Sequence, residues 1–380
     1  MRDKRRILVD ARTRMNYAMF APVHAAMRGD SRLRFAFISS EDPSRNREVF
    51  ADAGGDATLV GRLRAAMLRY DAYITSDFTW TKHVFSPVRI QMFHGVGGKY
   101  GFDAPAQSLR PWKRLFFVNR RRLENCIRAG AIEAGDPAIR LIGMPKVDCL
   151  VDGTLRRDQV LSQLALDPSR PTVLYAPTWS PASSLNTLGL ELVERLRALP
   201  INVVIKLHDR SHDPRPQYSG GVDWRQKLAP FLEPGRVLLA DAADICPYMV
   251  ASDVMITDHS SSGFEYLLLD RPVVRIHIPE LITLANIHPD YVALLTSAAQ
   301  SVHDASQTAR AIEIALAEPE AKSATRRAVA AELFHRPGSA TDRCAAELYE
   351  AVNLQPVTAN RSASAAGSTV GPSYPTFERR

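Results

Sequence analysis

Residues 254–269 read VMITDHSSSGFEYLLL, an apolar run followed by a hydroxyl-rich turn and a second apolar run. The β-branched residues of 254–257 predict a short buried strand, and the residues from Ser262 onward predict a helix. A strand that passes through a turn into a helix is the repeating unit of parallel sheets. Free backbone amides at such a helix start, together with serine hydroxyls, form an anion site. This stretch therefore predicts both a class of fold and a place for phosphate.

Similar apolar runs recur in both halves of the chain. In the second half they lie at 172–176, 202–207, 237–240, 254–257 and 273–278, and in the first half at 7–11, 33–38, 72–75, 88–93, 115–118 and 139–142. Near-continuous apolar strands alternating with amphipathic segments are typical of parallel sheets covered on both faces. The two series predict an α/β fold of two Rossmann-like domains whose sheets face a central cleft.

We place the domains at residues 1–150 and 151–352, with a closing helix at 340–352. Residues 353–380 are rich in Ser, Ala, Thr, Gly and Pro and poor in large apolar residues, so we expect a disordered tail. The apolar run at 7–9 is too short for a signal peptide. The four cysteines are scattered and form no C-x-x-C pair, which favours a reducing compartment over a disulfide framework or a zinc site.

The charge is unevenly distributed along the chain. Residues 1–150 carry 26 Lys and Arg against 15 Asp and Glu, whereas the remainder carries 22 against 26. A basic first half suggests an anionic partner, namely a membrane surface, a phosphorylated acceptor or nucleic acid. The alternative is an arginine-rich soluble protein without such a partner. No stretch of the chain reaches the 18 to 20 apolar residues, roughly, of a membrane span.

A glycine-rich loop follows the predicted strand at 88–93. It reads HGVGGK over residues 94–99. Glycines permit close backbone approach and Lys99 can reach a phosphate, although the spacing is not that of a P-loop. His94 at a strand end is suited to a general base because its ordinary pKa lies near neutrality. A structural histidine in a glycine turn is the alternative.

Two further strand ends carry polar residues. Thr178 and Trp179 follow the run at 172–176, where they can line a nucleotide pocket or simply contact the other domain. Lys206 and His208 end the run at 202–207 and point to the same side. A lysine within an apolar strand is costly unless it meets an anion, so this pair predicts a phosphate site. The alternative is two polar residues that merely emerge at a strand end.

The stretch at 254–269 supplies the remaining candidates. Ser260, Ser261 and Ser262 predict phosphate binding, and Glu265 in the first helical turn either binds ribose hydroxyls or serves as a favourable N-terminal charge. The carboxylates near these four places stand singly, which favours a metal-independent site. No G-x-S-x-G elbow indicates a hydrolase, and no G-x-G-x-x-G follows the first strand.

Taken in order, these motifs resemble those of the CDP-glycerol glycerophosphotransferase family of teichoic-acid and capsule polymerases. The stretch FHGVGGK at 93–99 is similar to the family's W-H-G-x-x-x-K, and GMPKVD at 143–148 to its G-x-P-R-x-D. YAPTWS at 175–180 resembles Y-A-P-T-W-R, Lys206-Leu207-His208 matches K-x-H, and ITDHSS at 256–261 resembles I-T-D-Y-S-S. PGSAT at 337–341 resembles the family's last motif, D-G-x-A.

The resemblance implies a GT-B fold, with the acceptor on the first domain and a CDP-activated donor on the second. It implies that His94 is the base and that His208 stabilises charge as CMP leaves. The implied catalytic residues are His94 and His208, and the implied donor-binding residues are Gly95, Lys99, Thr178, Trp179, Lys206, Asp258, Ser260, Ser261, Ser262 and Glu265.

Other implications concern partners. The resemblance implies CDP-glycerol as donor, a membrane-linked or polymeric hydroxyl acceptor, an anionic membrane surface, no cofactor, no metal and no nucleic acid. It also implies a cytoplasmic protein, peripheral on the inner face of the membrane. Ser180, His259 and Phe93 depart from the usual Arg, Tyr and Trp, which leaves the polyol open. A GT-B glycosyltransferase using a nucleotide sugar, and a non-enzymatic polyanion-binding protein, are the alternatives.

Overall fold

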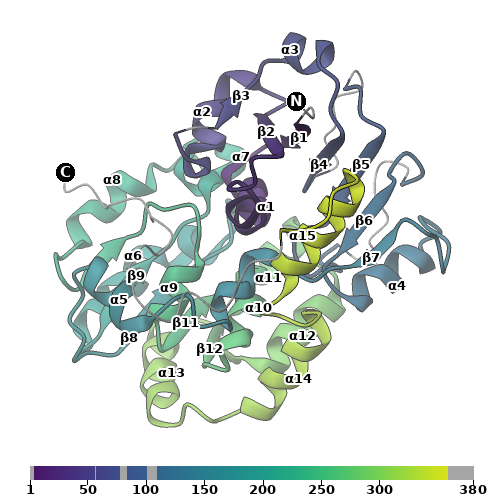
Figure 1. Cartoon of the computed structure of the whole chain (residues 1–380). Helices are drawn as coiled ribbons and strands as arrows, with labels where there is room; N and C mark the ends of the chain where they lie inside the picture. The colour runs from purple at the N-terminus through teal and green to yellow at the C-terminus, as the bar shows by residue number, and fades with distance from the viewer. Residues whose placement is uncertain (1–3, 56, 78–83, 101–108, 358–380) are drawn as a thin grey trace, which may run out of the picture.

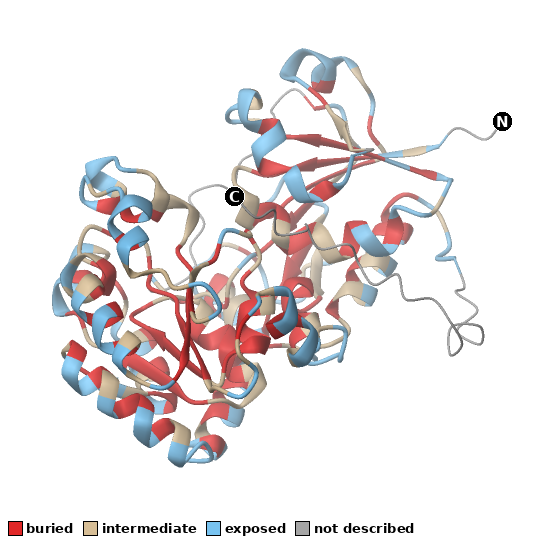
Figure 2. Ribbon diagram, turned by 90° about the vertical axis from the view of Figure 1, so that its left-hand side faces the viewer, coloured by how far each residue is buried: buried red, intermediate tan, exposed pale blue. Residues whose placement is uncertain are grey.

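The computed structural model describes residues 4–55, 57–77, 84–100 and 109–357. The predicted tail at 353–380 lies outside the described residues from 358 onward. Two parallel sheets form the centres of two α/β layers (Figure 1), and their strands are buried beneath exposed helix faces (Figure 2). The predicted α/β architecture of two Rossmann-like units is thereby confirmed.

The first sheet has seven strands in the order β3-β2-β1-β4-β5-β6-β7. Its strands are β1 (Arg5–Asp10), β2 (Leu33–Ile38), β3 (Thr58–Leu59), β4 (Ala72–Thr75), β5 (Val88–Met92), β6 (Arg114–Phe117) and β7 (Ile139–Leu141). The order reverses between β1 and β4, and all pairs are parallel. Crevices at such switch points, beyond the carboxyl ends of strands, are where ligands bind in open sheets.

The second sheet has six strands in the order β10-β9-β8-β11-β12-β13. Its strands are β8 (Thr172–Tyr175), β9 (Asn202–Ile205), β10 (Val237–Leu239), β11 (Val254–Thr257), β12 (Val273–Ile276) and β13 (Gln300–Val302). Here the order reverses between β8 and β11, so the loops after these two strands flank the second crevice.

Fifteen helices are seen among the described residues, most of them short. They are α1 (Arg14–Met27), α2 (Asn46–Val49), α3 (Arg62–Met67), α4 (Arg120–Arg128), α5 (Arg157–Gln163), α6 (Ser184–Ala198), α7 (Pro216–Ser219), α8 (Trp224–Leu228), α9 (Cys246–Ala251), α10 (Ser262–Tyr266), α11 (Pro279–Leu284), α12 (Pro289–Ala298), α13 (Ala305–Ala317), α14 (Ser323–Leu333) and α15 (Ala340–Ala351). None of these helices is both long enough and apolar enough to cross a bilayer.

Two strands were not predicted from the sequence. β3 and β13 are edge strands of two and three residues, too short for any apolar periodicity to show. β9 is also shorter than the predicted strand and ends at Ile205. Lys206 and His208 therefore lie in the loop beyond its carboxyl end, where side chains can face a ligand.

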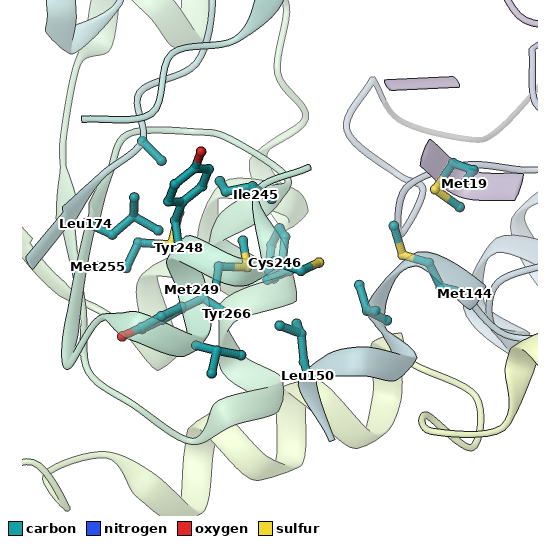
Figure 3. Packing of buried hydrophobic residues seen from close by; sticks show 14 of the residues in the cluster. Met19, Met144, Leu150, Leu174, Ile245, Cys246, Tyr248, Met249, Met255 and Tyr266 are labelled. Carbon is teal, nitrogen blue, oxygen red and sulfur yellow. The ribbon is translucent and has the colours of Figure 1, made fainter. Parts of the chain in front are cut away.

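A 3₁₀ segment, η3 (Pro145–Leu150), joins the two sheets. Figure 3 shows Met144 beside Met19 of α1, while Leu150 lies on the side of Cys246 and Tyr266. A single apolar cluster runs through this segment and includes core residues of both sheets. The two α/β units thus share part of one core, and the joining segment is held in place by packing on both sides.

The last helix returns to the first sheet. Arg114 of β6 and Arg140 in β7 form ion pairs with Glu350 (3.0 Å) and Glu347 (2.8 Å) of α15. We assigned residues 340–352 to the second domain, but α15 packs against α1 and η3. The helix therefore crosses back over the joining segment.

Asp148 in η3 holds the start of α15. Its carboxylate accepts hydrogen bonds from the backbone amides of Gly338 (2.7 Å), Ala340 (3.1 Å) and Thr341 (2.7 Å). It satisfies amides that a helix start leaves without intrahelical partners. Gly143 approaches the same segment so closely that a Cβ would lie 2.6 Å from the carbonyl oxygen of His335. The motifs at 143–148 and 337–341 are therefore two sides of one contact.

Replacing Asp148 by alanine should lower the free energy of unfolding by about 3 kcal/mol, because three amides lose a charged acceptor in a buried place. Urea unfolding, followed by circular dichroism, measures the loss. Asp158→Ala is the matched control, since Asp158 is exposed and forms an ion pair with its neighbour Arg156. Equal unfolding midpoints for Asp148→Ala and wild type would contradict this role.

Candidate active site

The glycine loop after β5 is held from behind by α4. Arg122 donates to the carbonyl oxygens of His94 and Gly95, and Asn119 donates to that of Val96 at 3.0 Å. Gly95, Gly97 and Gly98 all have φ between +69° and +80°, a region that side chains disfavour. The sequence HGVGG therefore encodes a fixed backbone path that presents His94 at the carboxyl edge of the first sheet.

The hydrogen bond of His94 sets its tautomer. Nδ1 contacts the carbonyl oxygen of Ser76, at the end of β4, so Nδ1 carries the proton and Nε2 is a free acceptor. Surrounding protein atoms lower the pKa of His94 below its ordinary 6.5, and Arg122 adds to this shift, although the residue keeps contact with solvent. A neutral imidazole with a free Nε2 can accept a proton at neutral pH.

His208 has the opposite tautomer. Its Nδ1 accepts a hydrogen bond from the backbone amide of Arg210 at 3.1 Å, so the neutral ring carries its proton on Nε2. Burial, followed by the charges of Lys206 and Arg210, lowers the pKa of His208 to about 3. His208 is therefore a neutral hydrogen-bond donor over the physiological pH range.

Lys206, two residues earlier, is a buried cation that has no direct ion-pair partner among the described residues. It is 6% exposed, and its Nζ donates to the carbonyl oxygen of Leu207 at 2.7 Å. Burial is the main cause that lowers the pKa of Lys206, and the charges of Asp209 and Asp244 offset this effect only in part. Such a site is stabilised when an anion enters it.

The loop after β11 is organised by Asp258, which is fully buried. Its carboxylate accepts from the amides of Thr178 (2.8 Å), His259 (2.7 Å) and Ser184 (3.1 Å), and from the Ser184 hydroxyl (3.0 Å). We predicted Asp258 as a donor-binding residue, but these four donors occupy its lone pairs. Asp258 thus ties the loop after β8 to the loop after β11 and positions their other residues.

The serines stand at the start of α10. Ser260 and Ser262 share a hydrogen bond of 2.8 Å between their hydroxyl oxygens, and all three serines remain partly exposed. Lys99 of the first unit lies near them, since its charge is within electrostatic reach of Asp258 and His259. The backbone amide of His288 holds the carbonyl oxygen of Lys99 at 2.8 Å. The structure therefore brings the glycine loop and the serine loop together.

Trp179 belongs to a cluster of rings and cations at the same edge. The guanidinium carbon of Arg210 lies 4.3 Å from the centroid of the Trp179 ring, and Tyr218 meets that ring edge-on at 5.9 Å. The His208 ring lies 6.2 Å from Trp179. A half-buried indole beside the anion site can stack on a nucleobase, which is one of the two roles that the sequence left open for this position.

Lys146 is a residue of this site for which we predicted no role. Its Nζ lies 2.7 Å from a carboxylate oxygen of Glu265, and the side chains are 3% and 5% exposed. Burial is the largest single effect and acts to lower the pKa of Lys146, but the charge and hydrogen bond of Glu265, together with the charges of Cys246 and Asp244, raise the pKa on balance. Glu265 is therefore engaged by an ion pair, and it also lies in the first turn of α10, as one of our two predictions has it. The signal was a lysine in an otherwise apolar segment.

The two catalytic candidates do not touch each other in the described part of the chain. Both, however, lie within electrostatic reach of the Lys146 ammonium, which lowers the pKa of each. Lys99 also acts on His208. His94 and His208 therefore border the same region, at the facing carboxyl edges of the two sheets.

A pocket of about 640 Å³ lies next to this region, between α4, α12 and α14, with Gly98 in its wall. Its arginines are Arg120, Arg121 and Arg128, and its carboxylates are Glu124, Asp290 and Glu332. The balanced charges make it a poor place for a diphosphate, in contrast to the surroundings of Lys206. Among the described residues, no group of three His, Cys, Asp or Glu side chains is arranged to hold a metal ion.

The fold is shared with solved structures of low sequence identity. The wall teichoic acid polymerase TagF is 17% identical, with a TM-score of 0.66 over 91% of this chain and 88% of that one. The UDP-GlcNAc 2-epimerase of Neisseria meningitidis bound to UDP-GlcNAc is 14% identical, with a TM-score of 0.56 over 91% and 100%. At such identities the likeness shows the GT-B fold alone. No curated protein sequence matches the chain.

The sequence itself decides the family. Residues 58–345 match the profile described as CDP-glycerol:poly(glycerophosphate) glycerophosphotransferase. The match covers about three quarters of the chain and contains every residue of the site described above. The chain therefore belongs to the CDP-glycerol:poly(glycerophosphate) glycerophosphotransferase family.

Proposed function

We propose that this chain transfers glycerol phosphate from CDP-glycerol to a hydroxyl acceptor and releases CMP. The observation that carries the proposal is the buried Lys206, which has no direct ion-pair partner among the described residues and acts on the neighbouring His208, with the serines at the start of α10 near Lys99. Together they offer positive charge and hydrogen-bond donors to a diphosphate. Trp179 beside them is the proposed platform for the cytosine ring.

In the proposed reaction, Nε2 of His94 takes the proton of the acceptor hydroxyl. The hydroxyl oxygen attacks the donor's β-phosphorus, and the bond from that phosphorus to the bridging oxygen breaks. The bridging oxygen leaves with CMP and carries the negative charge. Lys206 and His208 stabilise this charge, which is the kind of interaction that contributes most to transfer at phosphorus. We propose no cofactor and no metal for this step.

The acceptor is proposed to be a membrane-linked or polymeric alcohol, met at the inner face of the membrane. The basic first half of the chain supports this proposal, since an anionic surface attracts it. The donor polyol is proposed to be glycerol on the strength of the family, while Ser180 and His259 leave room for ribitol.

A nucleotide-sugar glycosyltransferase is the second candidate. It is favoured by the GT-B fold shared with an epimerase that was solved with UDP-GlcNAc. A donor screen separates the two activities: CMP released from CDP-glycerol or CDP-ribitol supports phosphotransfer. Release of a nucleoside diphosphate from a sugar donor would instead support the glycosyltransferase and rule out phosphotransfer as the main activity.

His94→Ala and His208→Ala should each lower kcat by about a hundred- to ten-thousand-fold without unfolding the protein. CMP release from CDP-glycerol with a hydroxyl acceptor is the measurement. His303→Ala is the control, because His303 is exposed at the end of β13 and outside the proposed machinery. Near-normal turnover of either active-site variant would rule out the mechanism.

The pH dependence of kcat/KM should follow His94. Because its pKa is lowered from 6.5, the rate should stay on a plateau at neutral pH and fall only in the more acidic range. The pKa of His208 is about 3 in the folded protein and 6.5 in the unfolded chain. Below pH 6.5 the unfolded chain therefore takes up a proton that the folded protein does not, and the free energy of unfolding decreases. Circular dichroism at each pH checks that the protein is still folded. A fall of kcat/KM with a midpoint above pH 6.5 would contradict the role of His94 as the base.

Lys206→Met and Lys146→Met should change stability in opposite directions. Removing the buried Lys206 should raise the free energy of unfolding by about 1–2 kcal/mol while turnover collapses. Removing Lys146 should lower it by about 3–5 kcal/mol, because Glu265 is left as an unpaired buried charge. Urea unfolding and CMP release are measured together, and a Lys206→Met protein that is both less stable and fully active would refute an anion site.

A further inference from the structure

Two arginines stand side by side at the opposite end of the first sheet. Arg6 of β1 and Arg34 of β2 are direct register partners on adjacent parallel strands. Strands lie about 4.8 Å apart, and like charges that are directly opposite destabilise a sheet. Within the described residues, neither side chain has a carboxylate partner. Asp71, which lies nearby, is occupied by the guanidinium of Arg5 and the backbone amide of Arg6.

These arginines line a small pocket beneath α3. The pocket has a volume of about 110 Å³, and Arg64 of α3 and Tyr70 also line it. Tyr70 is 1% exposed, and its hydroxyl has no hydrogen-bond partner within the described ranges of the chain. Burial raises the pKa of Tyr70, so the hydroxyl keeps its proton and is a donor. An unsatisfied buried hydroxyl costs about 1–3 kcal/mol, which an anionic oxygen in the pocket would offset.

The outer side of α3 is apolar and exposed. Leu63 and Met67 are 82% and 85% exposed and, being four residues apart, lie on one face of the helix. Phe85 is 61% exposed and lies next to the end of α3, since its carbonyl oxygen accepts from the amide of Tyr70 at 3.0 Å. Residues 57–70 contain three arginines and no acidic residue. Figure 1 shows α3 at the end of the first unit that points away from the second.

We propose that this α3 surface docks on an anionic lipid bilayer. The phosphate of an anionic phospholipid enters the pocket of Arg6, Arg34 and Arg64, and Leu63, Met67 and Phe85 insert among the lipid chains. Charge alone would suit any phosphate, but an arginine pocket bordered by exposed apolar side chains matches the two layers of a bilayer surface. The surface would hold the enzyme beside a membrane-linked acceptor, and to that extent it rests on the proposed function.

The test is co-sedimentation with vesicles of phosphatidylglycerol and phosphatidylcholine, without substrates. Arg6→Gln/Arg34→Gln should lower the partition coefficient roughly thirty-fold. Each arginine near an anionic surface strengthens binding by a factor of about five to six, and two arginines multiply to about thirty. Leu63→Gln/Met67→Gln should lower it as well, and salt should weaken wild-type binding. The matched controls are Arg195→Gln/Arg310→Gln and Leu284→Gln, which remove exposed residues of the second unit.

Several outcomes would overturn the proposal. One is equal loss of binding in the control variants, which would mean general attraction by net charge. Another is a wild-type protein that ignores these vesicles while inorganic phosphate raises its melting temperature, because the pocket would then serve a soluble phosphate compound. Failure to bind either probe would leave the surface to a protein partner. CMP release with a soluble acceptor should be unchanged in all variants, so that loss of docking and loss of catalysis are told apart.

Discussion

The buried ion pair between Lys146 and Glu265 determines how the two halves of the site meet. Lys146 belongs to the segment that joins the sheets, and Glu265 belongs to the helix that follows the serine loop. Two charges removed from water are stable only while they remain together, so the pair opposes any shift of α10 relative to η3. The position of the serines relative to the His94 loop depends on this contact.

The remaining charges of the site follow a simple division. The carboxylates of Asp148 and Asp258 accept several hydrogen bonds each, nearly all of them from backbone amides. Their role is to hold segments of the backbone together. Among the described residues, the ammonium of Lys206 donates to a neighbouring carbonyl oxygen and forms no direct ion pair, and Asp209 and Asp244 act on it from farther away. A positive charge without a direct ion pair, in a place of low solvent access, is a strong attractor for phosphate oxygens. The protein thus carries in its free form an electrostatic imbalance that a diphosphate donor would correct.

The two imidazoles complement each other because their partners differ. A carbonyl oxygen faces Nδ1 of His94, whereas a backbone amide faces Nδ1 of His208. One ring consequently presents an acceptor and the other a donor, although both are neutral. General-base catalysis needs the first property and stabilisation of a leaving phosphate needs the second. Exchanging the two partners would exchange the roles.

Much of this protein is determined by its sequence alone. Apolar runs of four to six residues, alternating with amphipathic segments, favour parallel sheets covered by helices, because that arrangement buries both faces of such strands. Polar residues that end or follow those runs lie near carboxyl ends, which is why the sequence predicts His94, Thr178 and Lys206 as site residues. Only the tertiary structure shows that Asp258 points inward, that Lys146 meets Glu265 across 119 residues, that Arg6 stands beside Arg34, and that α15 returns to the first sheet. These facts depend on contacts between distant segments, and a linear pattern records the burial of a residue but not the partner that it meets.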